Sequence, residues 1–155
     1  MSLISYGPGS ETPPEQLQNN GFWPDVDPGD FRDVNRIDTS IPDARAIQAL
    51  GVAMADINRQ LADWQTERQA EGCATIDDVT PPAWATADHY PLLYRQAIYA
   101  TAHALLLERY RDHSATGDGD ERGEAKDLAA DDYRRDARWA VSEITGRNHT
   151  TVELI

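Results

Sequence analysis

The densest apolar stretch of the chain spans residues 91–111 and reads PLLYRQAIYATAHALLLERYR. Its apolar side chains cover far more than the stripe of about 100° with which a helix on one surface contacts a core. They are Leu92, Leu93, Tyr94, Ala97, Ile98, Ala100, Ala104, Leu105, Leu107 and Tyr110. Polar residues interrupt the run before it reaches the roughly 20 apolar residues of a membrane span. We therefore predict a central helix that neighbouring parts of a soluble protein enclose.

Two longer stretches on either side of it also have a helical period. Apolar residues recur at steps of three and four residues from Ile47 to Trp64, which is typical of a helix packed lengthwise on another. Ser40 or Asp43 is the candidate cap of this helix, and Gly72 is a natural stop. A last helix is expected over residues 124–145, with one apolar side formed by Leu128, Ala129, Tyr133, Ala137, Ala140, Val141 and Ile144.

Two shorter features complete the pattern. Asp27 before Pro28 suits the start of a helix, and Phe31, Val34 and Ile37 follow at three-residue spacing. Residues 73–86 carry prolines and turn residues, so we expect a connector that lies over the bundle. Its anchors would be Ile76, Val79 and Trp84, and Asp88 would cap the central helix.

These elements predict an all-α fold, a small helical bundle around one central helix. We expect an extended N-terminal arm over residues 1–27, a helical bundle domain over 28–146 and an extended C-terminal tail over 147–155. The first twenty residues have few apolar anchors, and a neighbouring protein is the simplest support for them. Phe22 and Trp23 then look like an anchor on an irregular segment, and the tail presents Val152, Leu154 and Ile155.

Composition narrows the function classes. The chain has 155 residues, the size of one domain, and a formal net charge of −13. Such a charge disfavours tight binding to nucleic acid through neutralised phosphates. A single cysteine cannot form an internal disulfide, and the first thirty residues hold no apolar run like that of a signal peptide. We expect the cytosol of the producing cell.

Candidate chemistry is sparse. The chain shows no glycine-rich phosphate loop, GxSxG elbow or CxxC pair, so we expect no catalytic residues and no cofactor. Oxygen ligands alternate from Asp112 in the loop 112–123, but Gly123 stands where a calcium-binding loop needs its bidentate glutamate, which favours a solvated loop and no metal. His103 has no partner at helical spacing, and a buried, hydrogen-bonded histidine is the favoured interpretation.

One dense polar cluster, residues 133–139, leaves two interpretations open. Arg134 and Arg138 share a helix face, Trp139 follows, and Asp131 is four residues before Arg135, at ion-pair spacing. The cluster is either a salt-bridged solvent face or a docking surface, because arginine, tyrosine and tryptophan dominate many protein interfaces.

Three stretches together resemble the head completion proteins of peduovirus-type tailed phages. They are Phe22, Trp23, Pro24, Asp25, Val26, Asp27 and Pro28; then Leu107, Glu108, Arg109, Tyr110 and Arg111; and finally Arg135, Asp136, Ala137, Arg138, Trp139, Ala140 and Val141 with Ile144, Gly146 and the tail 152–155. They run in the family's order over residues 22–155, and none is a catalytic motif.

The resemblance implies a structural virion protein at the head-tail junction, a ring of twelve copies that docks on the portal protein after DNA packaging. The ring would then receive a tail or neck completion protein, and packaged DNA would pass its lumen without specific binding; no membrane is involved. The residues expected to bind protein partners are Phe22, Trp23, Arg134, Arg138, Trp139, Val152, Leu154 and Ile155. Two rival classes are a cytosolic helical module that binds one regulatory partner and a calcium-dependent or metal enzyme.

Overall fold

The computed structural model describes residues 15–110 and 119–147. Within them the chain forms five α-helices and one short 3-10 helix: α1 (Pro28–Asn35), α2 (Asp43–Gln60), α3 (Ala62–Ala70), η1 (Ile76–Asp78), α4 (His89–Tyr110) and α5 (Gly119–Thr145). The all-α prediction is confirmed. The described part contains no strand, and its one isolated β-bridge joins Leu17 to Val26.

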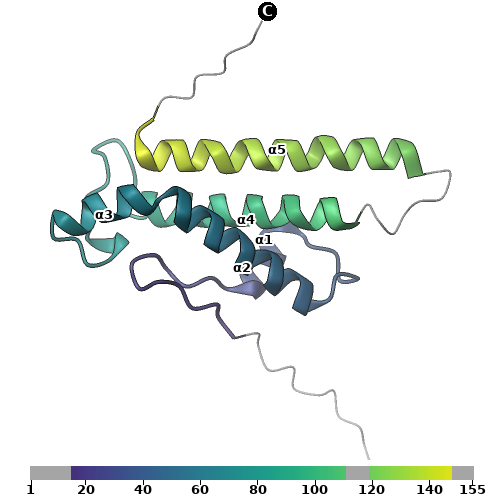
Figure 1. Cartoon of the computed structure of the whole chain (residues 1–155), viewed down its shortest axis with the longest axis horizontal. Coiled ribbons are helices and arrows are strands. Elements are labelled where there is room, and N and C mark those ends of the chain that lie inside the picture. Colours follow the sequence, from purple (N-terminus) through teal and green to yellow (C-terminus); the bar gives the residue numbers. More distant parts are fainter. Residues whose placement is uncertain (1–14, 111–118, 148–155) are drawn as a thin grey trace, which may run out of the picture.

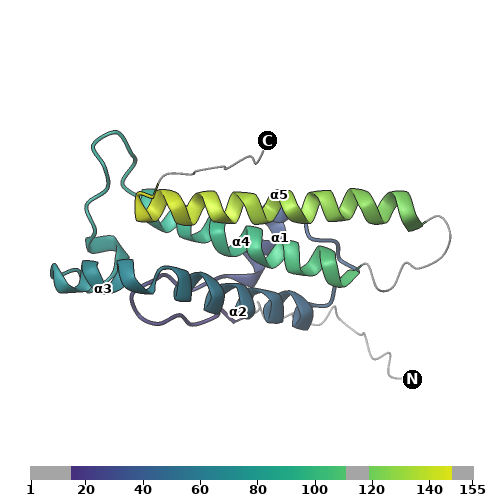
Figure 2. The same ribbon diagram turned by 45° about the horizontal axis from the view of Figure 1, so that its top comes forward.

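Helix α4 is the centre of the bundle, as its apolar surface predicted. It runs beside α5 along one side and contacts α2 on the other, so that it forms a middle layer (Figures 1 and 2). Eight of its side chains are buried: Tyr94, Ala97, Ile98, Tyr99, Ala100, Ala102, Ala104 and Leu106. Because neighbours cover α4 on several sides, it acts as the scaffold to which the other elements attach.

Local signals explain where most helices begin and end. The Asp27 carboxylate accepts hydrogen bonds from the backbone N–H groups of Gly29 (2.7 Å) and Asp30 (3.3 Å), which confirms the predicted cap of α1. At the other end of the chain, Gly146 adopts a left-handed φ of 64° and ends α5. The backbone N–H of Arg147 then donates to the carbonyl of Ser142 (3.1 Å).

The predicted helix over residues 47–64 is in fact two helices, α2 and α3, joined at Leu61. This residue has φ −97° and ψ 3°, outside helical geometry, and its side chain is completely buried. The expected cap at Ser40 or Asp43 was wrong: Pro42 precedes the helix, and no side chain caps it. Gly72, with φ 100°, follows α3 as predicted.

Helix α5 is longer than its apolar pattern indicated, and part of that pattern faces solvent. It begins at Gly119 rather than at residue 124, within the segment 112–123 that was expected to be a loop. Leu128 is 68% exposed, although we expected it on the buried side, and Val34 in α1 is exposed as well. Ala137, Ala140 and Ile144 are buried as predicted, and Ala130 is buried with them. Small alanine side chains allow α5 to lie close to α4.

Candidate protein-binding surfaces

The aromatic segment around Trp23 belongs to the core of this chain. Phe22 and Trp23 are 2% and 3% exposed. The ring of Trp23 is stacked between Tyr94 of α4, with centroids 4.4 Å apart, and Trp64 of α3, at 5.7 Å. The backbone carbonyl of Phe22 also accepts a hydrogen bond from Ile76 in the connector (2.9 Å). These two rings were expected to dock on another protein, and their burial within this chain speaks against that interpretation.

A polar network fixes the same segment. Tyr94 donates its hydroxyl hydrogen to Asn58 Oδ1 (2.6 Å) and accepts a hydrogen bond from Asn19 Nδ2 (2.7 Å). Asn58 Nδ2 in turn donates to Asn19 Oδ1 (2.9 Å), which closes a ring of three side chains. Burial raises the pKa of Tyr94 well above its usual range, so the hydroxyl stays protonated. Residues 15–27 are thus non-helical, as predicted for the arm, yet packed on the bundle.

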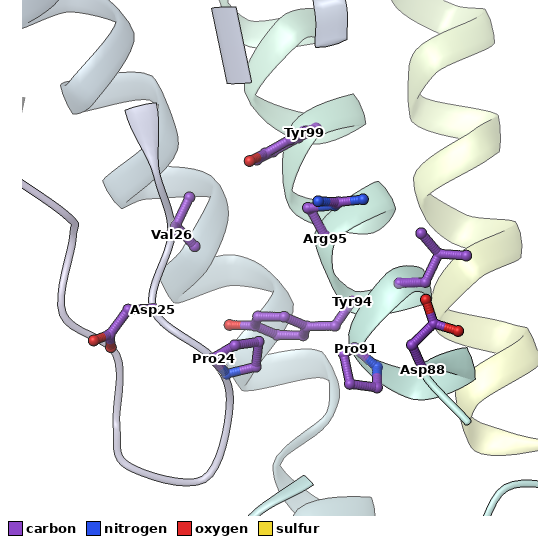
Figure 3. A pocket seen from close by; sticks show the side chains of 9 residues that line it. Pro24, Asp25, Val26, Asp88, Pro91, Tyr94, Arg95 and Tyr99 are labelled. Carbon is purple, nitrogen blue, oxygen red and sulfur yellow. The ribbon is translucent and has the colours of Figure 1, made fainter. Parts of the chain in front are cut away.

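A surface pocket of about 270 Å³ lies between this segment and the start of α4. Figure 3 shows that residues 24–26 lie on one side of it and α4 on the other. Its lining is Pro24, Asp25, Val26, Asp88, Pro91, Leu92, Tyr94, Arg95 and Tyr99. Tyr99 donates a hydrogen bond to Asp30 Oδ2 (2.6 Å), and Arg95 forms an ion pair with the same carboxylate (3.4 Å). The polar groups on this side of α4 are therefore engaged within the chain.

The cluster on α5 divides into a part that holds the bundle together and a part that faces solvent. Arg134 forms ion pairs with Glu108 of α4 and with Asp131 (3.8 Å). Arg135 pairs with Asp132 (3.0 Å), so the predicted pair between Asp131 and Arg135 was wrong. Spacings of three and of four residues both bring side chains onto one helix face, and in this helix the ion pair forms at the spacing of three.

The solvent-facing part is a stripe that sequence reasoning only partly identified. Trp139 is 49% exposed, and the guanidinium of Arg135 lies 5.2 Å from its ring centroid. Leu128 is seven residues before Arg135, which places the three side chains along one line of the helix. We call Leu128, Arg135 and Trp139 the α5 stripe. Arg138 is exposed beside it. The pattern contained this stripe, but helical spacing alone did not reveal which of the arginines would lie against Trp139.

A second exposed feature is Trp84 in the connector. It was expected to pin the connector to the bundle, but it is 73% exposed, whereas Ile76 and Val79 are buried as predicted. An open groove of about 490 Å³ extends from Trp84 to the end of α5. We call it the Trp84 groove. Its lining is Trp64, Glu67, Arg68, Pro82, Trp84, His89, Tyr90, Ser142, Glu143, Ile144, Thr145, Gly146 and Arg147. The connector can thus present a large apolar ring to a partner.

His103 lies between α4 and α5. Its ring is stacked on that of Tyr133, with centroids 4.2 Å apart. The Nδ1 atom is buried without a hydrogen-bond partner, so the expected hydrogen bond is wrong for this atom. Burial lowers the pKa of His103, because the charged imidazolium is poorly solvated there. This geometry favours a neutral ring that packs the interface between the two helices.

The remaining candidates fall partly outside the described structure. Val152, Leu154 and Ile155 of the tail lie beyond it, as do most positions of the proposed calcium loop. In residues 15–110 and 119–147 no group of three or more histidine, cysteine, aspartate or glutamate side chains is placed to hold a metal ion. No helix in this part of the chain is long and apolar enough to cross a membrane.

Comparison with known proteins adds an independent observation. The profile of the family described as "Phage head completion protein (GPL)" matches residues 17–155. The "Head completion/stabilization protein" of Escherichia phage P2 is 32% identical over 139 residues, which cover 90% of this chain and 82% of the relative. The "Probable head completion/stabilization protein" of Haemophilus phage HP1 is 25% identical over 142 residues, covering 90% and 91%. No solved structure matches the chain significantly.

Proposed function

The chain belongs to the family of phage head completion proteins (GPL), and from this premise we propose that it forms an adaptor ring at the head-tail junction. In this proposal, twelve copies dock on the portal protein after DNA packaging, and the ring then provides the attachment site for a tail or neck completion protein. Host cytoplasm is the place of assembly and the virion the final location. The role is mechanical, and it needs interfaces rather than an active site.

The single observation that carries the proposal is that the family profile covers the whole helical core, from residue 17 onward. The described fold is consistent with a subunit of an oligomeric assembly. A closed ring requires each subunit to offer two different surfaces to its two neighbours. The α5 stripe and the Trp84 groove are two such surfaces, and each contains a large exposed apolar side chain.

The proposed contacts differ from the sequence expectation at two points, Arg134 and the pair Phe22 and Trp23. Arg138, Trp139 and the tail residues Val152, Leu154 and Ile155 remain proposed contacts with other copies or with the portal. Arg134 would contribute through its ion pair to Glu108, which holds α5 on α4. The proposed units become a bundle that includes residues 15–27 and a docking tail over 147–155, because Phe22 and Trp23 are buried in the bundle.

The net charge of −13 bears on the passage of DNA. A lumen lined by acidic side chains repels the phosphate backbone, so DNA would pass through the ring without adhering. An assembled ring whose lumen is lined by arginine would contradict this part of the proposal.

The experiment that tests the function uses the phage itself. We expect deletion of residues 150–155 to give a folded protein and full heads that fail to join tails, visible by electron microscopy. Trp139→Ala should lower the yield of joined particles, whereas Arg45→Ala, at an exposed position on α2, serves as the matched control. Infectious particles at the normal yield from the deletion would refute the docking role of the tail.

A second measurement addresses assembly. The pure protein should elute as a monomer or a weak oligomer in size-exclusion chromatography, and it should form an annular complex when portal is added. Association with portal that leaves the mass of the complex short of a ring would contradict the adaptor proposal.

A further inference from the structure

The described chain ends inside one of its own surface features. Gly146 and Arg147, the last described residues, both line the Trp84 groove. Residues 148–155, with the sequence NHTTVELI, continue from that point. The segment that carries the apolar positions of the tail therefore continues from a residue that lines the same groove as the exposed ring of Trp84.

We propose that the Trp84 groove is the seat of the chain's own C-terminal tail, which rests there through Val152, Leu154 and Ile155 until assembly. The inference goes beyond the proposed function, because it assigns a receptor to the tail in the free chain. It rests on the docking role that the proposed function gives to the tail. On assembly, a neighbouring copy or the portal would compete with the groove for the same apolar residues.

The lining of the groove combines aromatic rings with charged and polar groups, so it offers surfaces both to the apolar side chains and to the backbone of an extended peptide. Trp64, Trp84 and Tyr90 supply ring surfaces, and a pocket of about 490 Å³ lies within the range of roughly 300–1,000 Å³ typical of binding sites. Apolar residues that alternate with polar ones, as in the tail, can place side chains on such surfaces while the backbone stays extended. Of the three rings, that of Trp84 would bury the most apolar surface under a bound peptide, because most of it faces solvent.

The groove also contains a hydrogen-bond donor that lacks an acceptor. Arg68 forms an ion pair with Glu71 (3.0 Å), and its guanidinium lies 5.5 Å from the ring centroid of Trp64. Its Nε–H, however, is buried with no partner in the described residues. A buried unsatisfied donor is costly, and a peptide carbonyl is the simplest acceptor for it. The Arg68 side chain is 28% exposed, so a shift of its guanidinium toward the groove would let a carbonyl of the tail backbone accept this hydrogen bond.

Chain length favours the tail of the same molecule over that of a second copy. Val152 is five positions after Arg147, and these five steps span roughly 17 Å when fully extended, enough to turn back along a groove that starts at Arg147. A short tether gives an effective concentration of about 1 mM. If the tail binds the groove with a dissociation constant of about 100 µM, it would occupy the groove of its own chain in roughly 90% of the molecules. A second copy in dilute solution would compete only weakly.

The test follows the indole N–H signals of the full-length chain by 15N-edited NMR. The chain has four tryptophans, and single Trp→Phe variants assign their signals. We expect Leu154→Asp to shift the signal of Trp84 and to leave that of Trp139 unchanged, since Trp139 is exposed outside the groove. The wild-type signal should have the same position in dilute and concentrated samples. A peptide of residues 148–155 added to the Leu154→Asp chain should return the Trp84 signal to its wild-type position, whereas the same peptide with Leu154→Asp should not.

A second variant tests the contribution of the ring itself. Trp84→Ala should weaken binding of the peptide to the Leu154→Asp chain by about tenfold or more, as expected for a central aromatic anchor. Trp139→Ala is the matched control and should leave the binding unchanged. Circular dichroism checks that both variants keep the helical fold.

Each remaining outcome overturns the inference in a distinguishable way. Identical Trp84 signals in wild type and Leu154→Asp would mean that the tail is not in the groove. A Trp84 shift that appears only in concentrated samples would assign the groove to the tail of a second copy. If Leu154→Asp abolishes head-tail joining without moving the Trp84 signal, the tail does not bind the Trp84 groove, whereas its docking role in the proposed function is supported.

Discussion

Replacement of Trp23 by alanine would remove the ring that joins the N-terminal segment to the bundle. The ring is stacked between Tyr94 and Trp64, and its edge meets Phe22, with centroids 5.1 Å apart. Truncation of a large aromatic side chain in a core costs about 3–5 kcal/mol of unfolding free energy. Area gives a similar figure: about 200 Å² of buried surface at about 25 cal/mol per Å² is worth roughly 5 kcal/mol, an upper bound.

The assay is urea unfolding followed by circular dichroism at 222 nm, because the substitution removes a fluorophore. We expect the free energy of unfolding of Trp23→Ala to fall by about 3–5 kcal/mol, or the midpoint of thermal unfolding by roughly 6–20 °C for a domain of this size. Trp23→Phe should cost much less. Phenylalanine keeps most of the apolar volume, and it also removes the indole N–H, which is buried without a partner.

The control is Trp139→Ala, a deletion of the same side chain from the exposed α5 stripe, with an expected change within about 0.5 kcal/mol. The two tryptophans should therefore separate stability from assembly: loss of Trp23 destabilises the folded chain, and loss of Trp139 lowers the yield of joined particles. A change of less than about 1 kcal/mol for Trp23→Ala, together with loss of head-tail joining, would refute the core role. It would restore the sequence interpretation of Phe22 and Trp23 as a docking anchor.

Three further substitutions test other parts of the fold. Tyr94→Phe should cost about 1–3 kcal/mol in the same urea assay, since Asn58 Oδ1 loses its donor and Asn19 Nδ2 loses one of its acceptors; an unchanged midpoint would mean that water replaces the hydroxyl. The pKa of His103 is below 6.5 in the folded chain, so the unfolded chain binds this proton first as the pH falls. The free energy of unfolding should therefore be highest above pH 6.5 and should decrease as the pH drops from 6.5 toward the lower pKa of the folded chain. His103→Phe keeps a ring against Tyr133 without titrating, and a wild-type loss no steeper than that of this variant would contradict the assignment. Gly146→Ala should cost about 1–2 kcal/mol through its left-handed φ alone, because the added Cβ meets open space; no loss would mean that the end of α5 has shifted.

Local signals in the sequence predicted the helices well. The Asp27 and Pro28 pair marked the start of α1, and the all-round apolar surface of residues 91–111 marked α4 as the enclosed helix. These features depend on contacts within one or two turns, so spacing and residue type suffice to reveal them. The break at Leu61 was missed, because the apolar period continues through it without a proline or glycine.

Contacts between distant segments could not be read from spacing. Trp23 and Tyr94 are stacked although 71 positions separate them, and nothing near Trp23 in the sequence indicates that partner. The same limit explains Trp84. Three apolar residues in a loop without periodicity, Ile76, Val79 and Trp84, look equivalent, and only the packed bundle determines that the third is left in solvent.

Trp139 and the Trp84 groove lie at the same end of the bundle, whereas Leu128 of the α5 stripe lies toward the other end of α5. Trp139 lies three residues before Ser142, about 4.5 Å along the axis of α5, and Ser142 already lines the Trp84 groove. Figure 1 shows this end of α5 beside the connector and near α3. Because α4 is enclosed and the aromatic segment is covered, contacts with other proteins fall on the surfaces that remain. Substitutions near Trp139 and Trp84 should therefore affect assembly more than substitutions at the opposite end of α5, near Glu124.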